Sequence, residues 1–100
     1  MSLVSFPSWG MNYEDLIYRE GLYFEKFSDI PFSGDVKGEG VGKVLNGKPD
    51  GYWEYFYPNG SLGSTYHYQN GKANGPSVTY DESGNIASRG KWLDDHREGP

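Results

Sequence analysis

Short runs of apolar and aromatic residues alternate along this chain with clusters of Gly, Asn, Pro and Asp. Because aromatic and β-branched residues favour a pleated sheet and the clusters favour turns, each run predicts one β-strand. The predicted strands cover residues 16–19, 22–27, 32–37, 41–45, 52–57, 62–68, 78–80 and 86–92. Turns are expected at 20–21, 46–51 and 70–71, where Glu-Gly and Asn-Gly pairs favour tight hairpins. The pattern therefore predicts an all-β chain of consecutive hairpins.

The second half of the chain repeats at an interval of 24 residues. The recurring positions are Gly51 with Gly75 and Gly99, Gly60 with Gly84, Leu62 with Ile86, Ser64 with Ser88, and Tyr68 with Trp92. A period of this length is typical of architectures in which each unit is one supersecondary piece packed on its neighbours. Since an isolated hairpin is marginally stable, we expect the hairpins to lie side by side and share an apolar face. The result would be an elongated, single-layer antiparallel meander.

One hundred residues correspond to a single domain. Within it we distinguish an irregular N-terminal arm (1–15), N-terminal hairpins (16–50), two repeat units (51–74 and 75–98) and the opening of a truncated third unit (99–100). Two interpretations are open where the arm ends. We prefer a hairpin that pairs 16–19 with 22–27 over a short helix at 13–19 capped by Asn12. The arm and Pro100 are expected to blunt the two sheet edges.

The net charge narrows the class of partner. The chain has 14 acidic and 9 basic residues, for a formal charge of −5. Because binding to nucleic acid or to an anionic membrane depends on clustered Lys and Arg, neither is expected as a direct partner, and a protein with a basic surface fits better. There is no cysteine, and no apolar run approaches the roughly 18 residues that span a bilayer. We take the cytoplasm as the expected location.

A set of short motifs resembles a known family. The motifs are Asp50-Gly51-Tyr52-Trp53, Pro58-Asn59-Gly60-Ser61-Leu62, and Tyr68 followed by Asn70-Gly71-Lys72 and Gly75, with Arg19-Glu20-Gly21-Leu22-Tyr23, Pro31-Phe32-Ser33-Gly34, Gly38-Glu39-Gly40-Val41-Gly42 and Asn46-Gly47-Lys48 upstream. Together they resemble the bacterial MORN-repeat variant family, often labelled YwqK-type antitoxins, over roughly residues 16–99. The second unit departs from the family at Ser77, where a Trp is usual. The resemblance implies an array of hairpins that serves as an interaction or structural module, without an enzymatic site.

Candidate catalytic and metal-binding groups are few. The Gly-rich run at 38–43 lacks the spacing and the following Ser or Thr of a P-loop, so we interpret it as a turn. Asp94, Asp95 and His96 form a cluster that could suggest a zinc site, and zinc requires three or four ligands. The only other histidine, His67, falls in a different unit, so we interpret the cluster as a solvated turn. No serine stands in a nucleophile motif. We therefore expect no enzyme activity, no catalytic residue, no cofactor and no metal.

The repeat also sorts the aromatic residues. Positions that are apolar in both units are assigned to the packed face, together with Trp53: Phe56 with Tyr80, Leu62 with Ile86, and Tyr68 with Trp92. Four tyrosines of the first unit have no aromatic counterpart in the second: Tyr52, Tyr55, Tyr57 and Tyr66. We hypothesise that these four contact a partner, because Tyr offers a large contact area with a polar tip. The alternative is that they only cover one face of a thin sheet.

The sequence therefore predicts a non-enzymatic protein-interaction module whose tyrosine-rich face binds a partner, with acidic turns attracting a basic surface. One alternative is a small acidic inhibitor or antitoxin that occludes a basic, nucleic-acid-binding site on its target. Another is a self-assembling β-array, or a homodimer, that pairs through an open sheet edge at residues 80–92.

Overall fold

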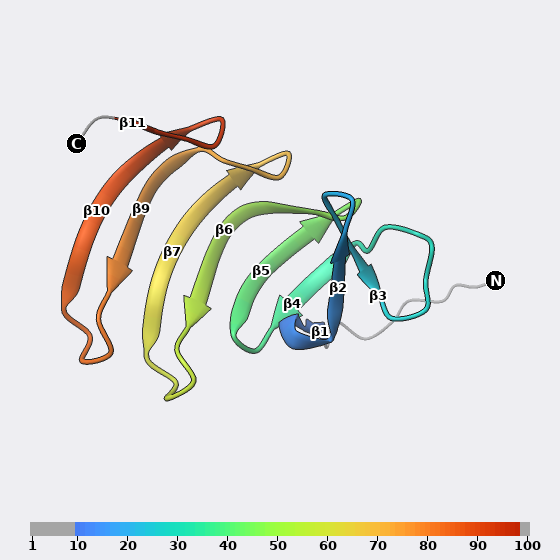
Figure 1. Ribbon diagram of the computed structural model, residues 1–100, viewed down its shortest axis with the longest axis horizontal. Coiled ribbons are helices and arrows are strands. Elements are labelled where there is room, and N and C mark those ends of the chain that lie inside the picture. Colours follow the sequence, from blue (N-terminus) through green and yellow to red (C-terminus); the bar gives the residue numbers. More distant parts are fainter. Residues whose placement is uncertain (1–9, 99–100) are drawn as a thin grey trace.

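A computed structural model describes residues 10–98 of the chain. It is an elongated, twisted sheet of successive hairpins with extents of 49 × 30 × 21 Å (Figure 1). Nine strands form the main sheet: β1 Met11–Asn12, β4 Gly34–Lys37, β5 Gly40–Leu45, β6 Lys48–Phe56, β7 Leu62–Gln69, β8 Lys72–Ala73, β9 Gly75–Tyr80, β10 Ile86–Leu93 and β11 His96–Glu98. Two more form a separate pair: β2 Leu16–Arg19 and β3 Leu22–Glu25. The all-β meander of hairpins is confirmed.

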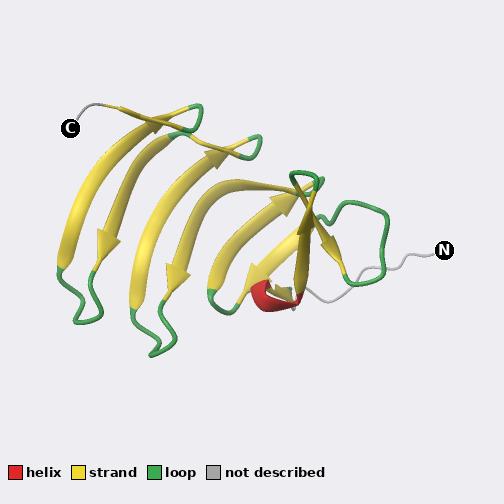
Figure 2. Cartoon of the chain, viewed as in Figure 1, coloured by secondary structure: helices red, strands yellow, loops and turns green. Residues whose placement is uncertain are grey.

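The strand order in the main sheet is β1-β4-β5-β6-β7-β9-β10-β11, with β8 paired to the end of β7. Neighbouring strands run antiparallel except β1 and β4, which are parallel with Met11 opposite Val36. Figure 2 shows that loops gather at the two ends of the strands and that helix is limited to one short segment. No helix in the described part of the chain is long and apolar enough to cross a bilayer.

Four two-residue turns close the hairpins at one end of the sheet. In each, both central residues have positive φ angles: Glu20 52° and Gly21 79°, Asn46 51° and Gly47 83°, Asn70 52° and Gly71 82°, and Asp94 49° and Asp95 71°. This is the type I′ geometry, which matches the twist of the flanking strands. Asp94-Asp95 adopts it without glycine because Asp tolerates the left-handed region better than most residues.

Hydrogen bonds at the turns recur 24 residues apart. The Tyr57 N–H donates to the Ser61 carbonyl at 2.9 Å, as the Asp81 N–H does to the Asn85 carbonyl at 2.9 Å. The same interval relates Gly71 N to Pro49 O (3.1 Å) and Asp95 N to Ala73 O (2.8 Å). Residues at equivalent sequence positions therefore make equivalent backbone contacts in this part of the sheet.

Several predicted boundaries are wrong: the strand expected at 22–27 ends at Glu25, the strand expected at 78–80 begins at Gly75, and two more boundaries differ for reasons that the structure shows. The turn expected at 46–51 is only Asn46-Gly47, and β6 begins at Lys48, because Pro49 and Asp50 still pair with β5. The strand expected at 32–37 begins at Gly34. Phe32 instead bridges two hairpins: its N–H donates to the Tyr23 carbonyl at 2.9 Å and its carbonyl accepts from Gly47 at 2.7 Å. The first boundary follows from the two-residue turn, which lets Pro49 pair directly with Val44, and tertiary hydrogen bonding decides the second.

The hairpin of β2 and β3 forms as preferred, with Leu16 opposite Glu25 and Arg19 opposite Leu22. The helix interpretation fails because the helical segment is a single 3-10 turn at Tyr13–Asp15, after which Leu16 is extended with φ −83° and ψ 147°. The hairpin does not extend the main sheet edge to edge as expected; it lies across one face of it (Figure 1). The expectations for residues 1–9, Gly99 and Pro100 lie outside the described residues.

The core lies between this hairpin and the main sheet. Leu16, Val36, Val44 and Trp53 are its buried members, and Trp53 is only 1% exposed. The Trp53 indole N–H donates to the Lys43 carbonyl at 3.0 Å, which fixes the ring over β5. We call the covered side of the main sheet the hairpin face; it carries Trp53 and Tyr55 of β6 and Tyr66 and Tyr68 of β7.

Candidate functional site

A row of aromatic rings leads along the hairpin face from the core toward the C-terminal strands. Trp53 stacks with Tyr55 at a centroid separation of 5.7 Å, and Tyr55 meets Tyr66 edge-on at 6.0 Å. Tyr66 in turn lies 6.1 Å from Trp92. The row crosses from β6 to β10, and such ring pairs favour tilted and edge-to-face geometries at these separations.

Strand register produces the row. Trp53 pairs with Tyr66 and Tyr55 with Ser64 between β6 and β7, while Ser64 pairs with Thr79 of β9. Because directly opposite residues of an antiparallel pair project to the same side of the sheet, these side chains share the hairpin face. Hydroxyl groups of Ser and Thr are thus placed next to the aromatic rings.

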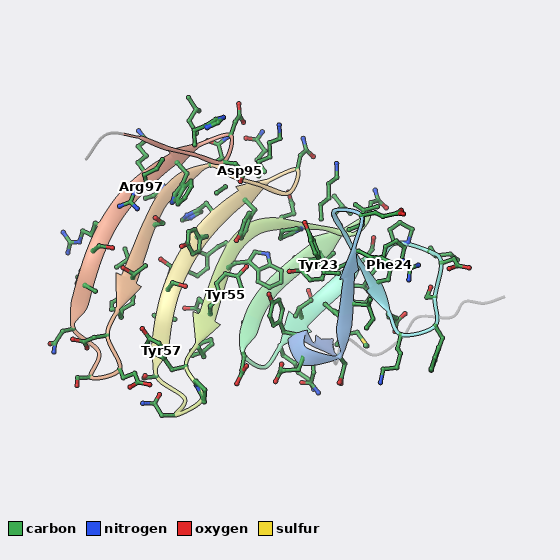
Figure 3. All side chains as sticks on the ribbon, in the orientation of Figure 1. Tyr23, Phe24, Tyr55, Tyr57, Asp95 and Arg97 are labelled. Atoms are coloured by element: carbon green, nitrogen blue, oxygen red, sulfur yellow. The ribbon has the colours of Figure 1, made fainter. Side chains whose placement is uncertain are left out.

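The row borders an open hollow of ≈ 260 Å³, which we call the aromatic hollow. Its lining comes from β6, β7, β9 and the loop after β6: Tyr55, Phe56, Tyr57, Gly63, Ser64, Tyr66 and Thr79. No residue of the β2–β3 hairpin lines it, so this part of the hairpin face is left open (Figures 1 and 3). The hollow offers both ring surface and hydroxyl groups to a partner.

The structure brings together three of the four tyrosines singled out in the sequence. Tyr55, Tyr57 and Tyr66 all line the aromatic hollow. Tyr52 does not, because it lies on the opposite face of β6, where it is 50% exposed and its ring is 5.2 Å from that of His67. The Tyr52 hydroxyl donates to the Glu54 carboxylate at 3.2 Å. One strand therefore presents tyrosines to two different faces.

The three hollow tyrosines differ in how firmly they are held. Tyr57 is anchored by its hydroxyl, which donates to the Tyr80 carbonyl at 2.6 Å. Tyr55 packs against the core, and its hydroxyl lies 3.0 Å from that of Tyr68. Burial, followed by that hydrogen bond, raises the pKa of Tyr55 well above its usual range, so it stays protonated. Tyr66 contributes its ring to the row, and its hydroxyl makes no hydrogen bond to another group within residues 10–98.

Sorting residues by recurrence identified only part of the packed face. Trp53 is buried as expected, but Ile86, assigned to the same face, is 48% exposed. Tyr68 packs against the core as expected, whereas Trp92, also assigned to packing, belongs to the aromatic row. Sequence reasoning missed Ser64 and Thr79, because small polar residues on strands give no signal until the register is known.

The second unit fills its hairpin face differently. Ser77 stands 24 residues after Trp53, is buried, and accepts a hydrogen bond from the Trp92 indole N–H at 2.9 Å. The larger Trp92, at the position equivalent to Tyr68, thus occupies space that a second Trp would need. Arg97 of β11 reaches back over this region, with its guanidinium 5.8 Å from the Trp92 ring centre and 3.0 Å from the Arg89 carbonyl (Figure 3).

Two of the groups considered for metal binding contact the backbone, and one of them is His67, whose Nδ1 lies 3.2 Å from the Pro76 carbonyl. The Asp95 carboxylate accepts the Ala73 N–H at 2.6 Å. Within residues 10–98 no group of three or more His, Cys, Asp or Glu is arranged to hold a metal ion. The Gly-rich run at 38–43 reverses the chain at Gly38 and Glu39 and continues as the first part of β5. What the hairpin face offers is ring surface and neutral hydrogen-bonding groups.

A scan against protein-family models and searches of curated proteins and of solved structures found no match to this chain.

Proposed function

We propose that this chain is a non-enzymatic protein-interaction module that binds its partner in the aromatic hollow. The observation that carries the proposal is the aromatic row, which is covered by the β2–β3 hairpin over its core end and open where Tyr57, Tyr66 and Thr79 line the hollow. Tyrosine is favoured at interfaces because it combines a rigid ring with a polar tip.

Charge near the hollow favours a basic partner. The loop that follows β9 begins with Asp81 and Glu82, both exposed. The hydrogen bond from Tyr57 to the Tyr80 carbonyl ties this loop to the rim of the hollow. The Asn85 and Ser83 N–H groups donate to the Asp81 carboxylate and lower its pKa, so that it stays charged. Acidic groups at the rim of the aromatic hollow would raise the rate of association with a basic surface and make binding salt-sensitive.

The experiment is capture by the immobilised chain from a lysate of the source cells, at low and high salt. Ser64→Arg places a long charged side chain in the aromatic hollow without removing a core ring. Tyr66→Ser removes one of the aromatic rings that line the hollow. Both should abolish capture. Tyr52→Ser is the matched control, because it removes an equally large ring from the opposite face and should leave capture intact. Far-ultraviolet circular dichroism would check that each variant is folded.

The outcomes discriminate between the candidates. Loss of capture with Tyr52→Ser but not with Ser64→Arg would place binding on the opposite face and refute the proposal. A captured protein that binds nucleic acid, and whose nucleic-acid binding the chain blocks, would favour the inhibitor or antitoxin alternative. Salt-independent capture would exclude the role given to the acidic rim.

A second candidate function rests on the open edge of the sheet. β10 pairs with β9 on one side, whereas β11 covers only Lys91 to Leu93 on the other. Within residues 10–98 the outer edge of residues 86–90 is left without a strand partner, and such an edge can pair with a second copy. The edge lies on β10 alone, since Tyr80 belongs to the interior strand β9. Light scattering over a concentration series tests this, and a strict monomer would exclude it.

A further inference from the structure

A second cavity, of ≈ 350 Å³, lies between the β2–β3 hairpin and the main sheet. Tyr18 and Tyr23 border it from the hairpin, and Tyr55 and Tyr68 border it from the sheet. Figure 3 shows Tyr23 and Tyr55 on these two elements. We call this cavity the tyrosine pocket. It shares only Tyr55 with the aromatic hollow.

The pocket is rich in hydrogen-bond donors. The hydroxyls of Tyr55 and Tyr68 lie 3.0 Å apart, so one donates to the other and the second hydrogen is left over. The hydroxyls of Tyr13 and Tyr23 form a similar pair at 3.3 Å. Burial raises the pKa of Tyr23 and of Tyr55 above the usual range, so these hydroxyls remain donors at neutral pH.

The pocket is also locally basic in an acidic chain. Lys48 and Lys72 line it, and no Asp or Glu does, although the chain has 14 acidic residues. Both lysines are exposed, and neither belongs to the ion pairs found among residues 10–98. Asp95 lies near enough to affect the pKa of Tyr68, but its carboxylate already accepts the Ala73 N–H at 2.6 Å. Two cationic groups therefore remain available for an anion.

We propose that the tyrosine pocket binds a small aromatic carboxylate. The ring of such a ligand would pack against the tyrosine rings, and its carboxylate would accept hydrogen bonds from Lys48, Lys72 and the spare hydroxyls. The volume is near the lower end of about 300–1,000 Å³ for small-molecule sites, which favours a compound of one or two rings. This site is distinct from the proposed protein-interaction surface, because Tyr55 is the single residue that lines both.

The test is a titration of the ¹⁵N-labelled full chain followed by nuclear magnetic resonance, with indole-3-acetate as the probe. We expect saturable amide shifts at Gly21, Asn70 and Gly71, which line the pocket, with a Kd on the order of 1 mM or tighter. Tryptophol, which keeps the ring and lacks the carboxylate, should bind at least tenfold more weakly. Cyclohexylacetate, which keeps the carboxylate and lacks the aromatic ring, should also bind more weakly.

Variants assign the charge contribution to the pocket. The double variant Lys48→Gln with Lys72→Gln should weaken indole-3-acetate binding at least tenfold, and it changes only exposed side chains. Lys37→Gln, an exposed lysine of β4 outside the pocket, is the matched control and should leave binding unchanged. Shifts confined to other residues, equal binding of tryptophol, or unchanged binding by the double variant would each overturn the proposal. Ser64→Arg should not affect this binding, which separates it from the test of the aromatic hollow.

Discussion

Replacing Gly42 with alanine should destabilise the fold through Trp53. A Cβ atom at Gly42 would lie 2.6 Å from Cγ of Trp53, where an ordinary carbon contact is about 3.5–4.0 Å. The indole has no room to move, because it is 1% exposed, donates to the Lys43 carbonyl and stacks with Tyr55. Overpacking of this kind costs about 1–3 kcal/mol, against a gain of about 0.4–1 kcal/mol from stiffening the unfolded chain.

Because a contact of 2.6 Å is a severe clash, the cost should lie in the upper part of that range, which leaves a net loss of about 1–2 kcal/mol of the free energy of unfolding. For a domain of this size each kcal/mol lowers Tm by about 4–8 °C. Urea unfolding followed by circular dichroism measures it. Gly63→Ala is the matched control, since its Cβ would lie 3.3 Å from both the Tyr55 carbonyl oxygen and the Tyr57 ring, a milder contact that should cost less. In a Trp53→Phe background the Gly42→Ala penalty should shrink. A neutral Gly42→Ala, or the same penalty in both backgrounds, would refute the packing described for this face.

Two further predictions follow from contacts of the hairpin face. Ser77→Ala should destabilise the chain by about 1 kcal/mol, because the Trp92 indole N–H loses its acceptor. Trp92→Phe should cost more. If the effects of the two substitutions on the free energy of unfolding simply add in the double variant, the contact between these side chains is contradicted. Raised pKa values of Tyr23, Tyr55 and Tyr68 mean that the folded state holds these protons more tightly than the unfolded state does. The contribution of these tyrosines to the free energy of unfolding should therefore be fully present below about pH 10 and be lost as the pH rises above it. Tyrosinate absorbance from these residues near pH 10, while the chain is still folded, would contradict this.

Local chemistry predicted the strands and turns well because their signals lie within a few residues of each other. Asn70-Gly71 forms the expected type I′ turn, and β7 matches the expected strand from Leu62 to within one residue. Boundaries failed where partners distant in sequence decided them. Phe32 leaves its predicted strand because its backbone groups bond to Tyr23 and Gly47 instead.

For the candidate site, too, the sequence predicted some features and the tertiary structure decided the others. The sequence identified Tyr52, Tyr55, Tyr57 and Tyr66 as a set by comparing the two units, but it carried no information on which face each would occupy. Strand register separates Tyr52 from the other three, because neighbouring residues of a strand project to opposite sides of the sheet.

The sequence by itself determined the all-β class, the order of the hairpins and the conformation of their turns, since these follow from residues that are close neighbours along the chain. Only the tertiary structure decided that the hairpin of β2 and β3 lies across the sheet and does not extend it. That placement buries Trp53, closes the tyrosine pocket and leaves the aromatic hollow open. It depends on contacts between the N-terminal hairpin and strands of the main sheet, which no local pattern encodes.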